Sequence, residues 1–252
     1  MLLFVLIGGL LGLFLAGIPG ALAGAFIGGA LARMLLTRLF ARGLDAVRAR
    51  FLESTFAVMG ALCKADGRVT DDEIRVAERF FSRLALSREQ RQTAQQAFRR
   101  GKADGFDLDA ELAGLRAVAG RSPALLQFFV EVQLSAITAD GVVHPEEHAL
   151  FVRIARELGM SEADLERLEA MLRGSTGAES GPDRLEAAYA TLGVDPETED
   201  AEVKKAYRRM MSQHHPDKLA ARGLPDSMRP VAEEKTREIR KAFETIREQR
   251  GY

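Results

Sequence analysis

The stretch from Leu2 to Ala32 contains no charged side chain, and it constrains the chain more than any other feature. An α-helix of about 31 residues rises roughly 46 Å, which exceeds the ~30 Å hydrocarbon core of a bilayer. We therefore expect residues 1–32 to form one transmembrane anchor, tilted or kinked, with the kink at Pro19 because proline lacks a backbone donor. The two arms of a helical hairpin would each be too short to span the membrane.

A cluster of basic residues follows the anchor directly. Residues 33–50 carry five arginines against a single acid, Asp45. Basic flanks stay on the cytoplasmic side, so we expect a basic juxtamembrane segment followed by domains that face the cytoplasm. The alternative is a cleaved signal peptide ending near Ala23, but no positive region precedes the apolar run. The single cysteine, Cys63, excludes an intrachain disulfide and suits a reducing compartment.

Small residues recur at every fourth position of the anchor: Gly8, Gly12, Ala16, Gly20, Gly24, Gly28 and Ala32. Such a stripe on one helix face lets a second backbone approach closely. We therefore expect a homodimer through the anchor. Its interface residues would be Gly8, Gly12, Gly20, Gly24 and Gly28. The competing interpretation is that membrane helices are rich in glycine in any case.

Residues 51–174 contain an internal duplication. An Ala-Asp-Gly turn followed by Val and then Glu occurs at residues 65–73 and again at 139–147. Apolar residues after both copies fall at three- and four-residue steps, and Ser87 and Ser161 begin capping-box patterns. No run has the length and alternation of a strand. We therefore predict an all-α domain of short helices.

Each copy carries acidic residues around its turn: Asp66 and Glu73 in the first, Asp140 and Glu147 in the second. Their spacing partly matches a calcium-binding EF-hand loop, but acidic residues are missing from the first ligand positions, so ordinary calcium binding is not expected. Two interpretations stay open. The four carboxylates form a weak divalent-metal site, or the glycines supply turns and the glutamates cap the following helices.

The duplicated helices and acidic turns resemble the TerB-like family of helical domains over roughly residues 51–174. Metal binding has been implied for that family, but the resemblance implies no reaction. Residues 144–148 also match the His-x-x-Glu-His pattern of zinc proteases. In the duplication His144 aligns with Thr70, which precedes a helix, so the two histidines do not share a helix face. We do not expect protease activity.

Residues 175–182 are rich in Gly and Ser and contain Pro, which predicts a linker to a second soluble domain, residues 183–252. Acidic and basic residues balance in this domain, so nucleic-acid binding is not expected. Three helices are predicted, over 184–192, 199–213 and 228–248, and the second and third carry matching apolar faces. These faces comprise Val203, Ala206, Tyr207 and Met210, and Ile239, Ala242, Phe243 and Ile246.

Four motifs occur in order in this second domain: Tyr189-x-x-Leu192-Gly193, Lys205-Ala206-Tyr207-Arg208, His215-Pro216-Asp217 and Lys241-Ala242-Phe243. Together they resemble the J-domain family over almost all of residues 183–252. The resemblance implies a helical hairpin that binds a DnaK-type chaperone and stimulates its ATP hydrolysis. It also implies that this chain is not itself an enzyme. We expect no cofactor, apart from a possible divalent metal in the TerB-like domain.

The chaperone-binding residues implied by this resemblance are His215, Pro216, Asp217, Lys204, Lys205, Arg208, Arg209 and Lys218. Basic side chains would steer their helix toward an acidic surface of the chaperone, and the rigid Pro216 turn would present His215 and Asp217 as polar contacts. The neighbouring His214 is expected to be solvated at the helix end.

The order of anchor, TerB-like domain and J-domain resembles the bacterial inner-membrane DnaJ-like co-chaperones, as does the insertion at residues 219–225. This implies a single-pass inner-membrane protein with cytoplasmic soluble domains. It would direct a DnaK-type chaperone to clients near the membrane, whose identity the sequence does not give. The alternative is a membrane stress-sensing or metal-binding adaptor in which the TerB-like domain dominates.

Overall fold

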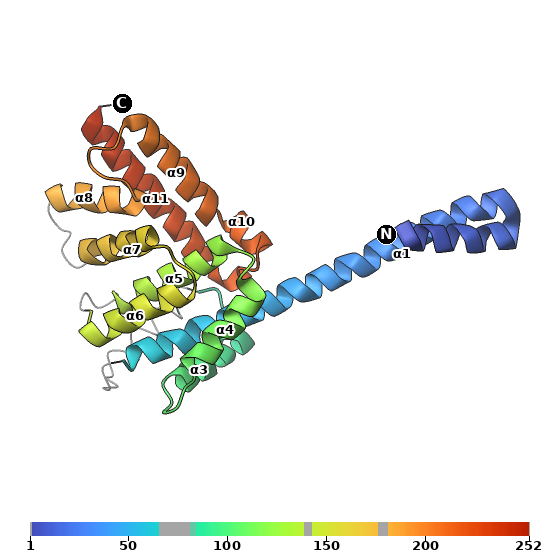
Figure 1. Cartoon of the computed structure of the whole chain (residues 1–252), viewed down its shortest axis with the longest axis horizontal. Helices are drawn as coiled ribbons and strands as arrows, with labels where there is room; N and C mark the ends of the chain where they lie inside the picture. The colour runs from blue at the N-terminus through green and yellow to red at the C-terminus, as the bar shows by residue number, and fades with distance from the viewer. Residues whose placement is uncertain (1, 66–81, 83, 139–142, 176–180, 252) are drawn as a thin grey trace. The chain divides into compact units, whose positions relative to one another are not determined.

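The computed structural model describes residues 2–65, 82, 84–138, 143–175 and 181–251 (Figure 1). Within these ranges every regular element is a helix, so the all-α prediction is confirmed. The chain divides into two compact units, residues 1–46 and 47–252. The helices are α1 (Leu2–Cys63), α3 (Arg88–Gly101), α4 (Leu108–Ala119), α5 (Pro123–Ile137), α6 (Pro145–Glu157), α7 (Glu162–Ser175), α8 (Gly181–Leu192), α9 (Asp200–His214), α10 (Pro216–Ala221), the 3₁₀ helix η1 (Asp226–Met228) and α11 (Arg229–Arg250).

The apolar segment Leu2–Leu36 of α1 has a mean hydropathy of 2.4, and among the described helices it alone is long and apolar enough to cross a membrane. Its backbone leaves helical geometry at Ala16 and Gly17, and Figure 1 shows the two arms running side by side. The predicted kink position, Pro19, is therefore wrong. Gly17 adopts φ 62°, which glycine tolerates best, whereas Pro19 lies in the first turn of the second arm, where its missing N–H is not needed.

The glycine stripe lies between these two arms. A Cβ added at Gly8 would lie 2.2 Å from the carbonyl oxygen of Gly24, and one at Gly12 would lie 1.9 Å from that of Gly20. Backbones approach this closely only where no side chain separates them. The glycines predicted to contact a second copy, Gly28 among them, thus pack within one chain in this structure.

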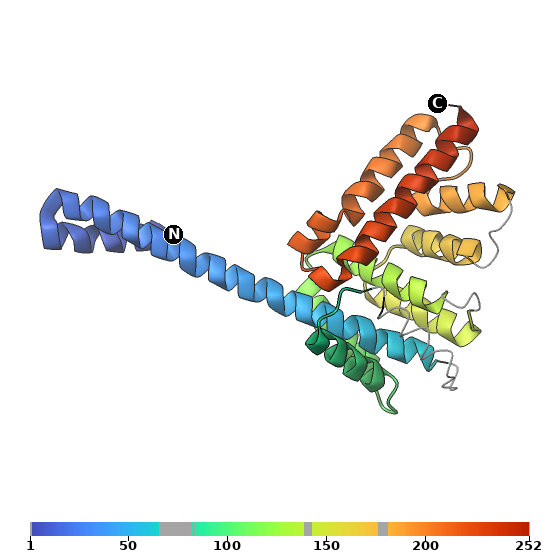
Figure 2. The same cartoon turned by 180° about the vertical axis from the view of Figure 1, so that it is seen from behind.

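The TerB-like domain comprises the C-terminal part of α1 and helices α3 to α7, packed around α5 (Figure 2). Almost every residue of α5 is buried, and Phe129 meets Phe51 of α1 edge to face, with ring centroids 5.6 Å apart. Where α1 crosses α3, a Cβ added at Gly101 would lie 1.8 Å from the carbonyl oxygen of Ala57. The domain is therefore held by apolar contacts at helix crossings too close for larger residues.

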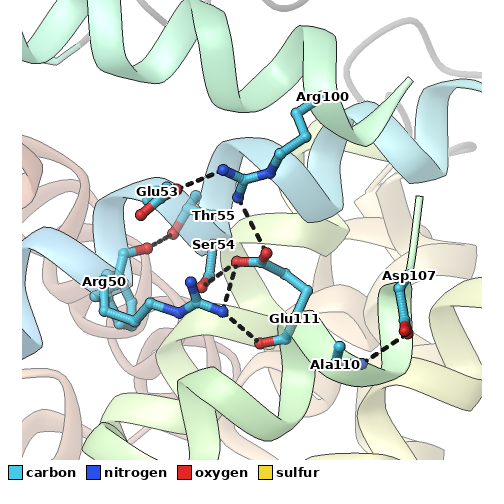
Figure 3. A network of polar contacts seen from close by, with 9 residues as sticks. Arg50, Glu53, Ser54, Thr55, Arg100, Asp107, Ala110 and Glu111 are labelled. Atoms are coloured by element: carbon cyan, nitrogen blue, oxygen red, sulfur yellow. Dashed lines mark hydrogen bonds and ion pairs between the residues drawn. The ribbon is translucent and has the colours of Figure 1, made fainter. Parts of the chain in front are cut away.

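A buried carboxylate joins three helices of this domain (Figure 3). Glu111 of α4 is 6% exposed, and its Oε1 accepts a hydrogen bond from Ser54 Oγ of α1 at 2.7 Å. Arg50 of α1 lies 3.2 Å from the same oxygen, and Arg100 of α3 donates to Oε2 at 3.0 Å. Both carboxylate oxygens are thus paired, which a buried charge requires.

The J-domain is built on α9 and α11, which run antiparallel side by side in Figures 1 and 2. The apolar faces predicted for these two helices meet as expected: Val203, Met210, Ile239 and Ile246 are each fully buried. The Tyr207 and Phe243 rings stack with centroids 4.3 Å apart. Helix α8 completes this core with Leu192 and Tyr189.

The J-domain and the TerB-like domain pack against each other through hydrophobic contacts. The Gly- and Ser-rich linker predicted between them gives no sign of this packing. Four buried side chains from α10, η1, α11 and their connections belong to the same cluster as the TerB-like core: Leu219, Leu224, Met228 and Ala232. Gly223 has φ 111°, and a Cβ there would lie 2.3 Å from Val47 Cγ1. The backbone N–H of Ala85 donates to the Ser227 carbonyl at 3.1 Å. Of the predicted linker at 175–182, residues 176–180 lie outside the described part.

Candidate chaperone-binding site

The His-Pro-Asp sequence forms the junction between α9 and α10. Helix α9 ends at His214, His215 adopts an extended conformation (φ −59°, ψ 124°), and Pro216 is the first residue of α10. A proline suits this position because it has no N–H to leave unpaired and its φ is fixed. The N–H of Asp217 donates to His215 Nδ1 at 3.2 Å, which closes the turn.

The junction exposes its polar side chains and buries its apolar ones. The side chains of His215 and Asp217 are 48% and 66% exposed, whereas Pro216 is buried and Leu219 is fully inaccessible. Buried Pro216 and Leu219 thus anchor a short turn whose two polar side chains are available to a partner. This is the presentation that the sequence predicts for the motif.

Asp217 is oriented from α11. Its Oδ1 accepts a hydrogen bond from Arg229 Nη2 at 2.7 Å, and Arg229 in turn contacts Glu233 Oε1 at 3.1 Å. Hydrogen bonds to Asp217 and then Glu233 raise the pKa of Arg229, so this guanidinium stays charged. The Asp217 carboxylate therefore faces a fixed positive charge on its own domain.

The predicted basic residues lie on one exposed surface. Lys204, Lys205, Arg208 and Arg209 are all exposed on α9, and residues three or four positions apart, such as Lys204 with Arg208 and Lys205 with Arg209, are neighbours on a helix surface. Lys205 pairs with Glu202 at 3.2 Å, and Lys218 Nζ donates to Ser212 Oγ at 2.5 Å. The structure thus places four of the predicted basic residues on α9 and the fifth, Lys218, on the short helix α10 that follows.

His214 is buried, so the prediction that it is solvated is wrong. It is 1% exposed; its Nδ1 lies 2.9 Å from the Met210 carbonyl oxygen and its Nε2 lies 2.8 Å from Glu131 Oε2. Glu131 belongs to α5 of the TerB-like domain. A charged residue in the middle of an apolar helix needs a buried partner, and this signal in the sequence could have pointed to the contact.

Glu131 remains ionised despite its burial. Desolvation raises its pKa, but the charge and hydrogen bond of His214, followed by the charges of Lys235 and Arg167, outweigh it and lower the pKa from 4.5 to about 2. Gln127 Nε2 donates to Oε1 at 3.1 Å, so both carboxylate oxygens are engaged. The carboxylate thus joins helices of both domains.

Only one of the four predicted metal-binding residues lies in the described part of the chain. Asp66, Glu73 and Asp140 lie outside it, so the metal site stays a prediction. Glu147 Oε2 accepts a hydrogen bond from the backbone N–H of His144 at 3.0 Å, at the start of α6. Glu147 therefore has the capping role that was the alternative interpretation, and His144 precedes the helix, as the duplication predicts.

Comparison with known proteins assigns both domains. Residues 52–170 match the family described as tellurite resistance protein TerB, and residues 187–250 match the DnaJ domain. The co-chaperone protein DjlA of Photobacterium profundum is 44% identical over 220 residues, which cover 81% of this chain and 79% of that protein. The protein of the same name from Escherichia coli (strain K12) is 40% identical over 221 residues, covering 81% of each chain. No match was found among solved structures.

These matches bear on the whole architecture. The two family matches occur in the order predicted from the motifs, and the apolar segment precedes both. A J-domain in a co-chaperone points to a DnaK-type partner and to regulation of that partner rather than catalysis by the chain. With its two domains matched and its relatives aligned along most of their length, the chain belongs to the DjlA family of J-domain co-chaperones.

Proposed function

We propose that this chain stimulates ATP hydrolysis by a DnaK-type chaperone through the His215-Pro216-Asp217 turn. The observation that carries the proposal is the exposure of His215 and Asp217 on a turn anchored by buried Pro216 and Leu219. A turn fixed in this way loses little conformational freedom when a partner binds, so more of the contact energy is available to favour one chaperone conformation.

The basic face of α9 supplies the second part of the proposed interaction. Four exposed cations on one helix face favour encounter with an acidic surface and make association depend on salt. The face contributes affinity and orientation, whereas the turn contributes the contacts that change the partner's activity. Raising the salt concentration should therefore weaken binding before it changes the maximal stimulated rate.

Steady-state ATPase assays test the proposal. The full chain in detergent micelles is titrated into a DnaK-type chaperone, and the wild type should raise the ATPase rate in a saturable manner. His215→Gln should return the rate to that of the chaperone alone. His144→Gln is the matched control, because His144 is exposed on the other domain and should leave stimulation intact. No stimulation by the wild type, or full stimulation by His215→Gln, would overturn the proposal.

The membrane part of the proposal is that the segment Leu2–Leu36 anchors the chain in the inner membrane with both domains in the cytoplasm. The basic residues after the anchor support this orientation. The chaperone would then act on clients near the cytoplasmic face. A fluorescent reporter fused at the C-terminus should report the cytoplasm, and protection of both domains in spheroplasts treated with protease should agree. Digestion of the domains from outside would contradict it.

Dimerisation through the anchor stays part of the proposal. The same glycines that pack between the two arms of one chain would pack two chains together, so the two arrangements exclude each other. Crosslinking in membranes should capture a dimer of the wild type and of Gly9→Leu, which lies off the stripe. Gly12→Leu should lose it. Monomers alone in the wild type would favour the arrangement within one chain.

Divalent-metal binding by Asp66, Glu73, Asp140 and Glu147 is a separate proposal for the TerB-like domain. Titration of the full chain with Mn²⁺ should show saturable binding that Asp66→Ala and Asp140→Ala weaken. Binding unchanged in both variants would leave the glycine turns and helix capping as the role of these segments.

A further inference from the structure

The residue before the His-Pro-Asp turn is tied to the other domain. His214 is the last residue of α9, and its ring is held between its own helix, through Met210, and Glu131 of α5. Both side chains are almost fully buried, at 2% and 4% exposure. Since His215 follows directly, the direction in which the turn leaves α9 depends on how His214 is held.

The chemistry of this contact makes it specific. Both ring nitrogens of His214 face oxygen acceptors, the Met210 carbonyl and the Glu131 carboxylate. A ring nitrogen that carries a proton can donate to the oxygen it faces. A hydrogen bond to an ionised carboxylate is charge-assisted, short and directional. The pair therefore fixes the orientation of the ring as well as its position.

The other end of the turn is held by the same domain. Leu219 and Leu224, which follow the turn, lie in the hydrophobic cluster of the TerB-like core. Gly223 approaches Val47 so closely that no Cβ fits between them. The TerB-like domain thus holds the chain on both sides of the turn and leaves the polar side chains of His215 and Asp217 exposed.

We infer that Glu131 of the TerB-like domain is a positioning residue for the His215-Pro216-Asp217 turn, which it orients through the hydrogen bond to His214. The inference rests on the proposed function and deepens it. The TerB-like domain is then a structural part of the chaperone-stimulating site, not only a separate module on the same chain. Glu131 does not touch the chaperone; it acts through the direction in which the turn is presented.

When a chaperone is titrated with variants of this chain, loss of stability and loss of turn positioning change different parameters of the ATPase curve. A variant that is partly unfolded has fewer active molecules, so more total protein is needed for half-maximal stimulation, but the maximum is unchanged. A folded variant with a misdirected turn still docks through the exposed face of α9, so its half-maximal concentration is unchanged and its maximum is lower. The two parameters therefore separate the explanations.

The test uses the full chain and two substitutions of Glu131. Glu131→Leu introduces an apolar side chain of similar size and removes the hydrogen bond, and should lower the maximal ATPase stimulation about three- to thirtyfold. Glu131→Gln keeps a hydrogen bond, because its amide can donate to a neutral His214 ring that still donates to Met210. It should retain most of the stimulation. Glu146→Leu makes the first change at an exposed position of α6 and should equal the wild type.

Each result bears on the inference. A lower maximum for Glu131→Leu, an unchanged half-maximal concentration and retention by Glu131→Gln would support it. A wild-type maximum for Glu131→Leu would overturn it while the proposed function stands, whether or not the half-maximal concentration rises. Equal losses for both variants would contradict a hydrogen-bonded tether. If the wild type gives no stimulation, the proposed function fails first and the inference with it.

Discussion

Glu111 and Glu131 are both buried acids, but they connect different parts of the structure. Glu111 joins three helices of one domain, whereas Glu131 joins α5 to the J-domain. In each case a basic side chain hydrogen-bonds to the carboxylate, and this pairing offsets the free-energy cost of burying the charge. Removing one member of such a set leaves its partners without their counter-charge, and the cost depends on how far each partner reaches solvent.

Glu111→Gln should destabilise the TerB-like domain. The change leaves Arg50 and Arg100 facing a neutral amide, and the expected loss is about 3 kcal/mol, at the lower end for buried pairs because Arg100 reaches solvent. Urea unfolding of the full chain, followed by circular dichroism, measures it. Glu166→Gln, an exposed position in α7, is the control and should change stability by less than about 0.5 kcal/mol. Equal stabilities would show that the Glu111 network does not stabilise the fold.

Glu131 also makes a definite contribution to the pH dependence of stability. Its pKa is about 2 in the folded protein against 4.5 as the ordinary value, so the unfolded chain takes up the proton at higher pH. The ionised group therefore stabilises the fold fully above pH 4.5, and this contribution is lost as the pH falls from 4.5 to about 2. In Glu131→Gln the unfolding free energy should fall less steeply across that window. Parallel pH profiles for the two proteins would contradict the assignment.

At the scale of elements, the crossing of α1 and α3 depends on two glycines. A Cβ at Gly101 would lie 1.8 Å from the Ala57 carbonyl oxygen, and one at Gly60 would lie 2.2 Å from that of Phe98. Gly101→Ala must push the helices apart and should cost about 1–3 kcal/mol. Gly43→Ala is the matched control: nothing lies near its Cβ position, so better helix propensity should leave the protein equally or more stable. Thermal unfolding compares them, and a neutral Gly101→Ala would show that the crossing can relax.

The elements differ in how far their sequences predict them. The second and third helices of the J-domain were predicted to within two residues, because each has a complete apolar face and charged ends that local sequence reveals. Helix α10 was not predicted. It is six residues long and its buried side of Pro216 and Leu219 is defined by contact with other elements, not by periodicity. The bend at Gly17 was placed at Pro19 because proline is the stronger local signal.

The residues of the candidate site also differ in how far the sequence predicts their roles. The motifs and the helix periodicity indicate His215, Asp217 and the basic face of α9, because the proposed role of these residues requires only that they be exposed. They do not indicate the roles of His214 and Glu131, which lie 83 positions apart and meet only because two domains pack together. From a single sequence, a histidine at the end of a helix is predicted to be solvated. Only the unexplained charge of Glu131 within an apolar helix suggests otherwise.

At the scale of the whole molecule, the chain after the turn belongs to the core of the TerB-like domain. Leu224 and Met228 are buried in that cluster, although they lie in the J-domain by sequence. Folding of the J-domain therefore gains from contacts that its own small core does not provide. Residues 47–252 are one compact unit for this reason, and we expect them to unfold together.

Leu224→Ala tests this coupling. The side chain is 1% exposed in the TerB-like core, so its loss should cost about 2–5 kcal/mol and weaken the contact between the domains. Native-state hydrogen exchange should show helices α9 and α11 opening more readily than α5 in the variant, while all three open together in the wild type.

Leu192→Ala separates this effect from loss of J-domain stability. Leu192 is fully buried in the J-domain core and does not belong to the cluster shared with the TerB-like domain. It should accelerate exchange in α9 and α11 with the contact between the domains intact. The TerB-like domain holds the His215-Pro216-Asp217 turn only while the contact between the domains is intact. Leu224→Ala should therefore lower the maximal ATPase stimulation. Leu192→Ala should mainly raise the half-maximal concentration. The reverse pattern would show that the J-domain positions its turn without the TerB-like domain.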